Sequence, residues 1–154
     1  GITRTVPAVD GEFVFSLDPK CVLRCLDAKS GKPVWSRSLV DAYQTAIPPW
    51  YAGQCPLLDG DHLTVAPGAA ALVVALNKRT GDELWRTANP DAWPMSHASL
   101  MPGELAGVKQ YVYCSLPGLI GVSAADGAVL WKLPSKFNVA VAPSPLPSPY
   151  RFTR

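Results

Sequence analysis

LDAKSGKPVW, the stretch at residues 26–35, returns twice in this 154-residue chain, as LNKRTGDELW at residues 76–85 and as VSAADGAVLW at residues 122–131. In every copy a tryptophan follows a glycine by four residues. The pairs are Gly31 and Trp35, Gly81 and Trp85, and Gly127 and Trp131. The glycines lie 50 and 46 residues apart, a spacing typical of propeller blades and of helical arrays. The sequence therefore predicts a repeat protein.

Short apolar runs around each glycine decide between these two repeat classes. Runs such as 22–23, 72–74 and 129–131 are β-branched or aromatic, end at Pro, Gly or Asp, and are too short for helices. A tight turn needs one residue at positive φ, which glycine adopts without steric cost. The motif therefore predicts a strand, a turn and a second strand, with the tryptophan packed between neighbouring sheets. The predicted fold class is all-β.

A second glycine recurs upstream of each motif and sets the length of the repeat. Gly11, Gly60 and Gly107 precede the motif glycines by 20, 21 and 20 residues. Each unit then holds four antiparallel strands, as a propeller blade does. The predicted blades cover about residues 3–40, 54–88 and 98–134, and a fourth blade starts at 143–154. The predicted strands include 5–9, 12–17, 21–26 and 33–39, then 62–65, 71–76 and 83–87, then 110–114, 119–122 and 129–133.

Residues 1–154 are thus expected to form one partial β-propeller domain. Propellers close with about four to eight blades, so three blades and the start of a fourth require further blades to complete a ring. The chain opens on Gly1 without a leader pattern, and a leader is expected upstream or already removed. The longest apolar run, at 69–76, is far shorter than the roughly 20 residues that span a bilayer.

Composition and cysteine spacing argue against several classes of function. Sixteen prolines and a charged fraction of 17% suit a turn-rich all-β chain. The formal charge of +2 is small and the basic residues are scattered along the sequence, so nucleic-acid binding is not expected. The four cysteines form no C-x-x-C pair, and buried free thiols are the expected state. Residues 59–62 contain metal-ligand types, but their Asp-Gly is explained by a turn, and no metal site is predicted.

The pattern Asp-Ala-x-Ser/Thr-Gly-Lys-x-x-Trp resembles the repeats of the pyrroloquinoline quinone (PQQ)-like, or quinoprotein alcohol dehydrogenase-like, β-propeller superfamily. Residues 27–35 and 80–85 contain the best copies, whereas residues 125–131 keep the glycine and the tryptophan but have aspartate in place of threonine. The resemblance covers nearly the whole chain. It implies a tryptophan-docking motif, in which each tryptophan lies between neighbouring blades.

The resemblance implies different functions in different branches of the superfamily. Quinoprotein dehydrogenases hold PQQ over a calcium ion at the centre of the ring, use an aspartate as catalytic base and often have a disulfide between adjacent cysteines. This sequence has no adjacent cysteines, and no calcium-binding Glu or Asn and no catalytic Asp can be aligned. The same repeat serves the BamB-type outer-membrane assembly lipoprotein and many exported bacterial proteins, which residues 93–131 resemble most.

Two connections between blades are longer than a blade requires, at residues 41–54 and 89–99. Both lead from an outer strand to the next inner strand, so we expect them side by side at the mouth of the central channel. Their candidate residues for binding a ligand or a partner are Tyr43, Trp50, Tyr51, Gln54, Trp93 and His97. The alternative is that these side chains pack on one another and shield the ends of the blades. His97 is either a donor to a ligand, a general base or a structural histidine.

The resemblance therefore implies a non-catalytic bacterial propeller module, periplasmic or otherwise exported, and we expect it to bind a protein partner or a small ligand through these loops. It needs no cofactor, and the remaining blades of the same propeller are its other expected partner. The competing hypothesis is a fragment of a PQQ-dependent oxidoreductase, in which the complete ring holds PQQ and calcium.

Overall fold

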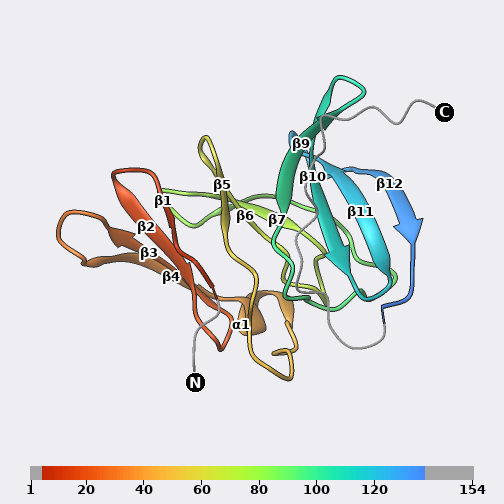
Figure 1. The fold of residues 1–154 in the computed structure, drawn as a ribbon. Helices are drawn as coiled ribbons and strands as arrows, with labels where there is room; N and C mark the ends of the chain where they lie inside the picture. Colours follow the sequence, from red (N-terminus) through yellow and green to blue (C-terminus); the bar gives the residue numbers. More distant parts are fainter. Residues whose placement is uncertain (1–4, 138–154) are drawn as a thin grey trace.

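The computed structural model describes residues 5–137, which form three four-stranded antiparallel sheets in chain order (Figure 1). We call these sheets blades 1, 2 and 3. Blade 1 consists of β1 (Ala8–Val9), β2 (Phe13–Leu17), β3 (Val22–Asp27) and β4 (Pro33–Ser38). Blade 2 consists of β5 (Leu57–Asp59), β6 (His62–Val65), β7 (Val74–Asn77) and β8 (Glu83–Arg86). Blade 3 consists of β9 (Met101–Leu105), β10 (Val108–Ser115), β11 (Gly118–Ser123) and β12 (Val129–Pro134). The prediction of an all-β fold with four-stranded blades is confirmed, while the fourth blade predicted at 143–154 lies outside the described residues.

The predicted strand at 71–76 is corrected at its start, because β7 begins at Val74. The preceding residues lie outside the regular ladder, where Ala71 forms an isolated bridge with Gly68 and Leu72 lies in a bend. Leu72 donates its N–H to the Thr87 carbonyl at 2.9 Å, and Thr87 donates its N–H to the Val73 carbonyl at 2.8 Å. These two bonds hold the segment against Thr87 outside β7.

A single-turn helix, α1 (Leu39–Tyr43), replaces the start of the loop predicted at 41–54. The Ser38 hydroxyl caps it by accepting the Asp41 N–H at 3.2 Å, the usual role of serine before a helix. The helix ends at Gln44, which adopts a left-handed conformation with φ of 58°. These local contacts turn the chain from blade 1 toward blade 2.

The repeated motif forms the same turn in all three blades. Its glycines have positive φ values of 70°, 77° and 74°, a conformation that strains any residue with a Cβ. Each glycine N–H donates to the carbonyl four residues earlier: Gly31 to Asp27 at 2.8 Å, Gly81 to Asn77 at 2.8 Å and Gly127 to Ser123 at 2.9 Å. The register between the third and fourth strands also shifts next to this turn in every blade. The strand–turn–strand prediction is confirmed.

The first two motif tryptophans, Trp35 and Trp85, lie against the turn of the following blade, whereas Trp131 lies against Gly121 of its own blade. A Cβ on Gly81 would be 2.8 Å from the Trp35 ring, and a Cβ on Gly127 would also overlap the Trp85 ring. The Trp35 Nε1 donates to the Lys78 carbonyl at 2.9 Å, which fixes the ring on this turn. The glycine therefore provides both the turn conformation and the space for the indole.

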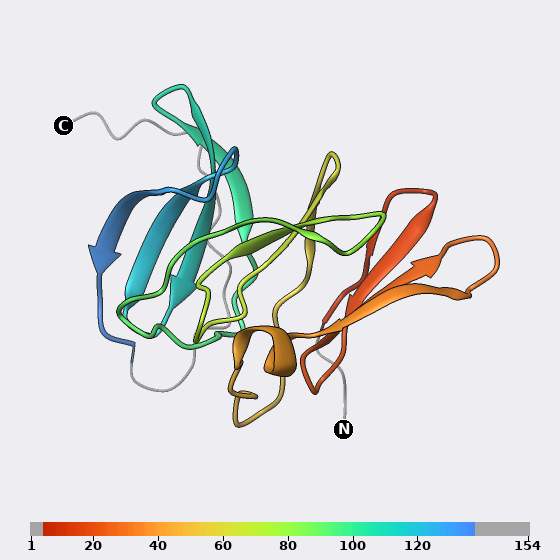
Figure 2. The same ribbon diagram turned by 180° about the vertical axis from the view of Figure 1, so that it is seen from behind.

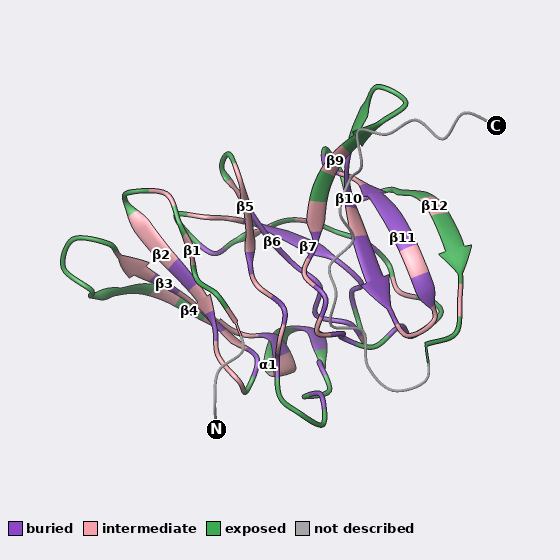
Figure 3. Cartoon of the chain, in the orientation of Figure 1, coloured by how far each residue is buried: buried purple, intermediate pink, exposed green. Residues whose placement is uncertain are grey.

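The hydrophobic core is divided between the two junctions of the blades (Figure 3). Fully buried Phe15 and Leu63 belong to a cluster between blades 1 and 2. Fully buried Val73, Tyr111 and Ile120 belong to a second cluster between blades 2 and 3. Burying each such side chain contributes roughly 1.5–3 kcal/mol, so adjacent blades stabilise one another.

Different segments lie at the two ends of the strands (Figures 1 and 2). Helix α1 and the loop that follows it lie at the lower end in both views, whereas the tip of the β5–β6 hairpin lies at the upper end. Among residues 5–137, no helix has the length and apolar character needed to cross a membrane.

Candidate functional site

The two long loops between blades lie side by side, as their topology predicts. The rings of Trp50 and His97, one from each loop, have centroids 6.4 Å apart and are tilted by 44°. A Cβ on Gly53 would be 2.5 Å from His97 Cδ2, so the glycine allows the imidazole to lie directly on the first loop. The loops therefore form one surface.

This surface contains an apolar cavity of about 200 Å³, which we call the loop cavity. Its lining residues come from the two loops and from the turn after β10: Ala46, Ile47, Pro48, Pro49, Trp50, Pro94, Met95, Ser96, His97 and Leu116. Trp50 is 48% exposed and Ile47 is 43% exposed, so one wall of the cavity is open to solvent. The cavity can accept an apolar group that enters from outside.

His97 provides a polar group with an unused hydrogen-bonding capacity. Its Nε2 is buried and has no hydrogen-bond partner among residues 5–137. Buried polar atoms are normally paired, so such an atom marks either strain or a site for a further partner. Tyr51, next to Trp50, is 46% exposed but does not line the cavity.

Tyr43, one of the predicted binding residues, lies in the interior and joins blades 1 and 2. Its side chain is 1% exposed, and its hydroxyl donates to Glu83 Oε2 at 2.8 Å and accepts from Arg37 Nη1 at 2.8 Å. Burial, together with the hydrogen bond to Glu83, raises the pKa of the Tyr43 phenol, which therefore stays protonated. The Arg86 guanidinium lies over its ring at 5.6 Å. These contacts support the packing alternative for this residue.

Gln54 and Trp93 are also buried and stabilise the loops. The Gln54 amide donates to the Ala66 carbonyl at 2.8 Å and accepts the Ala66 N–H at 2.9 Å. Trp93 is 6% exposed, and its backbone N–H donates to Asn89 Oδ1 at 2.9 Å. Of the six predicted residues, the structure thus brings Trp50 and His97 together at a cavity, leaves Tyr51 exposed beside it and directs Tyr43, Gln54 and Trp93 inward.

Several lining residues were not among the sequence candidates. Pro48 and Pro49 immediately precede Trp50, and this Pro-Pro-Trp run is a visible signal for a rigid aromatic wall. Met95 lies two residues before His97 in the second loop. Leu116 belongs to the turn between β10 and β11, and no sequence pattern connects it with the loops.

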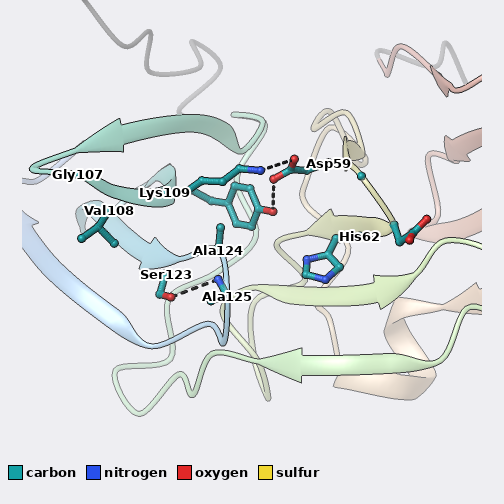
Figure 4. A pocket seen from close by; sticks show the side chains of 11 residues that line it. Asp59, His62, Gly107, Val108, Lys109, Ser123, Ala124 and Ala125 are labelled. Atoms are coloured by element: carbon teal, nitrogen blue, oxygen red, sulfur yellow. Dashed lines mark hydrogen bonds and ion pairs between the residues drawn. The ribbon is translucent and has the colours of Figure 1, made fainter.

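A second cavity, of about 560 Å³, lies between blades 2 and 3 at the opposite end of the strands, and we call it the junction cleft (Figure 4). It is lined by Asp59, Gly60, Asp61, His62, Gly107, Val108, Lys109, Tyr111, Ser123, Ala124 and Ala125. Asp59 accepts from Lys109 Nζ at 2.6 Å and from the Tyr111 hydroxyl at 2.7 Å. Burial alone would raise the pKa of Asp59, but these hydrogen bonds outweigh it and lower that pKa. Within residues 5–137, no group of three or more His, Cys, Asp or Glu side chains is arranged to hold a metal ion.

Comparison with known proteins gives one family and several structural relatives. The family model described as outer membrane protein assembly factor BamB matches residues 1–141. No curated protein sequence matches the chain. The crystal structure of BamB from Moraxella catarrhalis is similar with a TM-score of 0.59 and 17% identity, over 86% of this chain and 37% of that chain.

Two quinohemoprotein alcohol dehydrogenases also share the fold. The enzyme from Comamonas testosteroni has a TM-score of 0.63 and 14% identity, over 86% of this chain and 21% of its own. The enzyme ADHIIG from Pseudomonas putida HK5 has a TM-score of 0.57 and 15% identity, over 84% of this chain and 26% of its own. At these identities the likeness concerns the fold, and the chain spans well under half the length of each of these structures.

Proposed function

Because the chain belongs to the PQQ-like β-propeller family described by the outer membrane protein assembly factor BamB, we propose that it is a non-catalytic propeller module that binds a protein partner. The proposed binding site is the loop cavity, with Trp50 as its exposed wall and His97 as its polar group. The observation that supports this proposal most directly is the size and chemistry of this cavity.

The volume of the loop cavity favours a protein partner over a small ligand. Pockets that enclose small molecules have volumes of about 300–1,000 Å³. The loop cavity has about 200 Å³, which suits a single apolar side chain inserted from a partner. Protein interfaces commonly concentrate their binding energy in such an anchor residue and its pocket.

The exposed rim of the cavity supports the same interpretation. Trp50 and Ile47 are nearly half exposed, and tryptophan is enriched among residues that dominate binding energy at interfaces. The prolines at 48 and 49 fix the backbone before Trp50, so little conformational entropy is lost on binding. A polar group of the partner can satisfy the buried Nε2 of His97.

A display library of random 12-residue peptides, selected against the chain, tests this proposal. We expect the enriched peptides to share an apolar residue, and their affinity to fall at least tenfold with the Trp50→Ala variant. Tyr51→Ala is the matched control, because Tyr51 is similarly exposed and adjacent but lies outside the cavity. Affinity should change less than twofold in this control.

Two results would contradict the proposal. One is the absence of any enriched peptide, and the other is equal weakening by Trp50→Ala and Tyr51→Ala. Circular dichroism spectra of both variants should match the wild type, which separates loss of binding from loss of fold.

The oxidoreductase alternative implies that the complete ring holds PQQ and calcium. Calcium is held by six to eight oxygen ligands, and residues 5–137 contain no group of three or more His, Cys, Asp or Glu side chains that could hold a metal ion. The four cysteines are free, at positions 21, 25, 55 and 114. Our proposal is a function without a cofactor. Titration with PQQ and Ca²⁺ should leave the tryptophan emission without a saturable change, and a saturable quench would favour the enzyme.

The proposal includes an exported, periplasmic location and further blades of the same propeller, because this is the setting that the family suggests. The chain spans 37% of the BamB structure, which supports further blades in the same propeller. Fractionation of cells that produce the parent protein tests the location. Recovery in the cytoplasm would contradict it.

A further inference from the structure

Two basic side chains fill the junction between blades 1 and 2. Both belong to the turn between β7 and β8. Lys78 Nζ lies 3.0 Å from Asp10 Oδ2. Arg79 Nη2 lies 2.7 Å from Glu12 Oε2, and its guanidinium lies 5.5 Å from the centre of the Phe13 ring. At this junction a guanidinium group is therefore held between a carboxylate and an aromatic ring.

The next junction has the same backbone but lacks both basic side chains. Counted from the motif glycine, Ala124 and Ala125 occupy the positions that Lys78 and Arg79 have in the preceding blade. Methyl groups do not reach across the junction, and the space remains open as the junction cleft of about 560 Å³ (Figure 4). Comparison of one junction with the other thus shows which group is missing.

The opposite wall of the cleft keeps the features that receive the arginine at the first junction. Counted from the hairpin glycine, Asp61 stands in the position of Glu12, and His62 in the position of Phe13. Both side chains line the cleft. The Asp61 side chain is 81% exposed, and its contact with Lys78 is long, at 3.4 Å. A carboxylate and a flat ring therefore face space that a planar cation can enter.

The charges around the cleft favour a cation over an anion. Lys109 Nζ lies 2.6 Å from Asp59 Oδ1, so this positive charge is already paired, and the Tyr111 hydroxyl also donates to that carboxylate. This set is internally paired, which leaves Asp61 as the more exposed charge of the cleft. An anion would approach two carboxylates.

We propose that the junction cleft binds a guanidinium group, with the Asp61 carboxylate as its counter-charge and the His62 ring as the surface on which it stacks. The bound group would take the place that the Arg79 side chain has at the preceding junction. Planar guanidinium groups pair with carboxylates and stack on rings, whereas ammonium groups do so less well. This site is separate from the loop cavity, because it lies at the opposite end of the strands. Since exposed ion pairs are weak in water, a single guanidinium should bind weakly.

Titration of the ¹⁵N-labelled chain with N-acetyl-arginine amide tests the proposal. N-acetyl-citrulline amide is the matched probe, because it has the same length and a neutral head group. We expect saturable shifts of the backbone amides of Gly60, His62 and Ala125 with the arginine compound only. Equal shifts with both compounds, or shifts centred on the loop cavity, would overturn the proposal.

Two variants each give one junction the residue type that the other junction has, or remove it. Ala125→Arg gives the third blade the side chain that the second blade already has, so it should fill the cleft, preserve the fold and weaken binding at least tenfold. Arg79→Ala opens the equivalent space beside Glu12 and should add a second set of shifts at that hairpin. Unchanged binding in Ala125→Arg would refute the assignment even if Arg79→Ala failed to fold.

Two further probes identify the source of the guanidinium group. The peptide Gly-Arg-Gly presents it on a polypeptide, and agmatine presents it on a small molecule. Tighter binding of the peptide assigns the cleft to an arginine of a protein, whereas equal or tighter binding of agmatine assigns it to a small guanidinium compound. Failure of both probes to bind would overturn the proposal and would leave partner binding at the loop cavity unaffected.

Discussion

Replacement of Gly81 by alanine should destabilise the protein more than the same change at Gly31. Both glycines have similar positive φ values, of 77° and 70°, so each substitution costs roughly 1–2 kcal/mol in backbone strain. Their surroundings differ. A Cβ at position 81 would lie 2.8, 3.0 and 3.2 Å from three carbons of the Trp35 ring, whereas a Cβ at position 31 would meet no atom within 4 Å.

Overpacking against Trp35 adds a second cost at position 81 alone. Insertion of a carbon into a packed contact costs typically about 1–3 kcal/mol. We therefore expect Gly81→Ala to lower the free energy of unfolding by roughly 2–5 kcal/mol and Gly31→Ala by roughly 1–2 kcal/mol. Urea denaturation, followed by tryptophan fluorescence and circular dichroism, measures both values.

A double-mutant cycle with Trp35→Leu isolates the contact. This change keeps an apolar side chain beside the turn but removes the ring, so Gly81→Ala should then cost no more than Gly31→Ala. Equal losses for the two glycines in the wild-type background would refute the packing argument. A difference that persists in the Trp35→Leu background would refute it as well.

Three other perturbations have expected outcomes. Gln54→Leu should lower the free energy of unfolding by about 1–3 kcal/mol for each of the two buried Ala66 backbone groups that lose a partner, measured by urea denaturation. Asp59→Asn should reduce the loss of stability in acid. Hydrogen bonds from blade 3 outweigh burial and lower the pKa of this carboxyl in the folded protein below 3.8. Its contribution to stability is therefore complete at pH values above the pKa of the unfolded chain, and it is lost as the pH falls through the pKa of the folded protein. A thermal melt series from pH 7 to pH 2 should show a flatter profile for the variant. Iodoacetamide at pH 8 should label Cys55 before Cys21, because burial raises the pKa of the fully buried Cys21 thiol to about 11, and peptide mass mapping checks the order.

The blades were predictable because their determinants are local. The motif glycines need positive φ, and the polar residues before them hold the turn, so three repeats are enough to locate the strands. The start of β7 was predicted wrongly because residues 72 and 73 pair with Thr87, a contact that depends on how the blade ends. The helix α1 was missed because one capping serine supports only a single turn.

The candidate site was predictable in its location and only partly in its residues. Topology alone brings Trp50 and His97 together, since both loops leave the same end of adjacent blades. The inward positions of Tyr43 and Gln54 depend on partners elsewhere in the fold, such as Glu83 and the Ala66 backbone. The junction cleft follows from a difference between repeats, which becomes meaningful when the arginine of the preceding junction is seen in place.

Trp35 and Trp85 each pack on the motif glycine of the following blade, which gives the array a polarity. At both described junctions one blade supplies the tryptophan and the next supplies the glycine turn that receives it, so the contact is heterologous and cannot be satisfied by two blades facing each other through the same surface. In the described residues the motif turn of blade 1 receives no tryptophan, because no atom lies within 4 Å of the position of a Cβ on Gly31. A blade added before blade 1 would match this turn by supplying a tryptophan, whereas Trp131 lies against Gly121 of its own blade and donates its Nε1–H to Gln110 Oε1 at 2.6 Å. A series of such contacts is complete only when the tryptophan of the last blade packs on the glycine turn of the first, as it would in a closed ring.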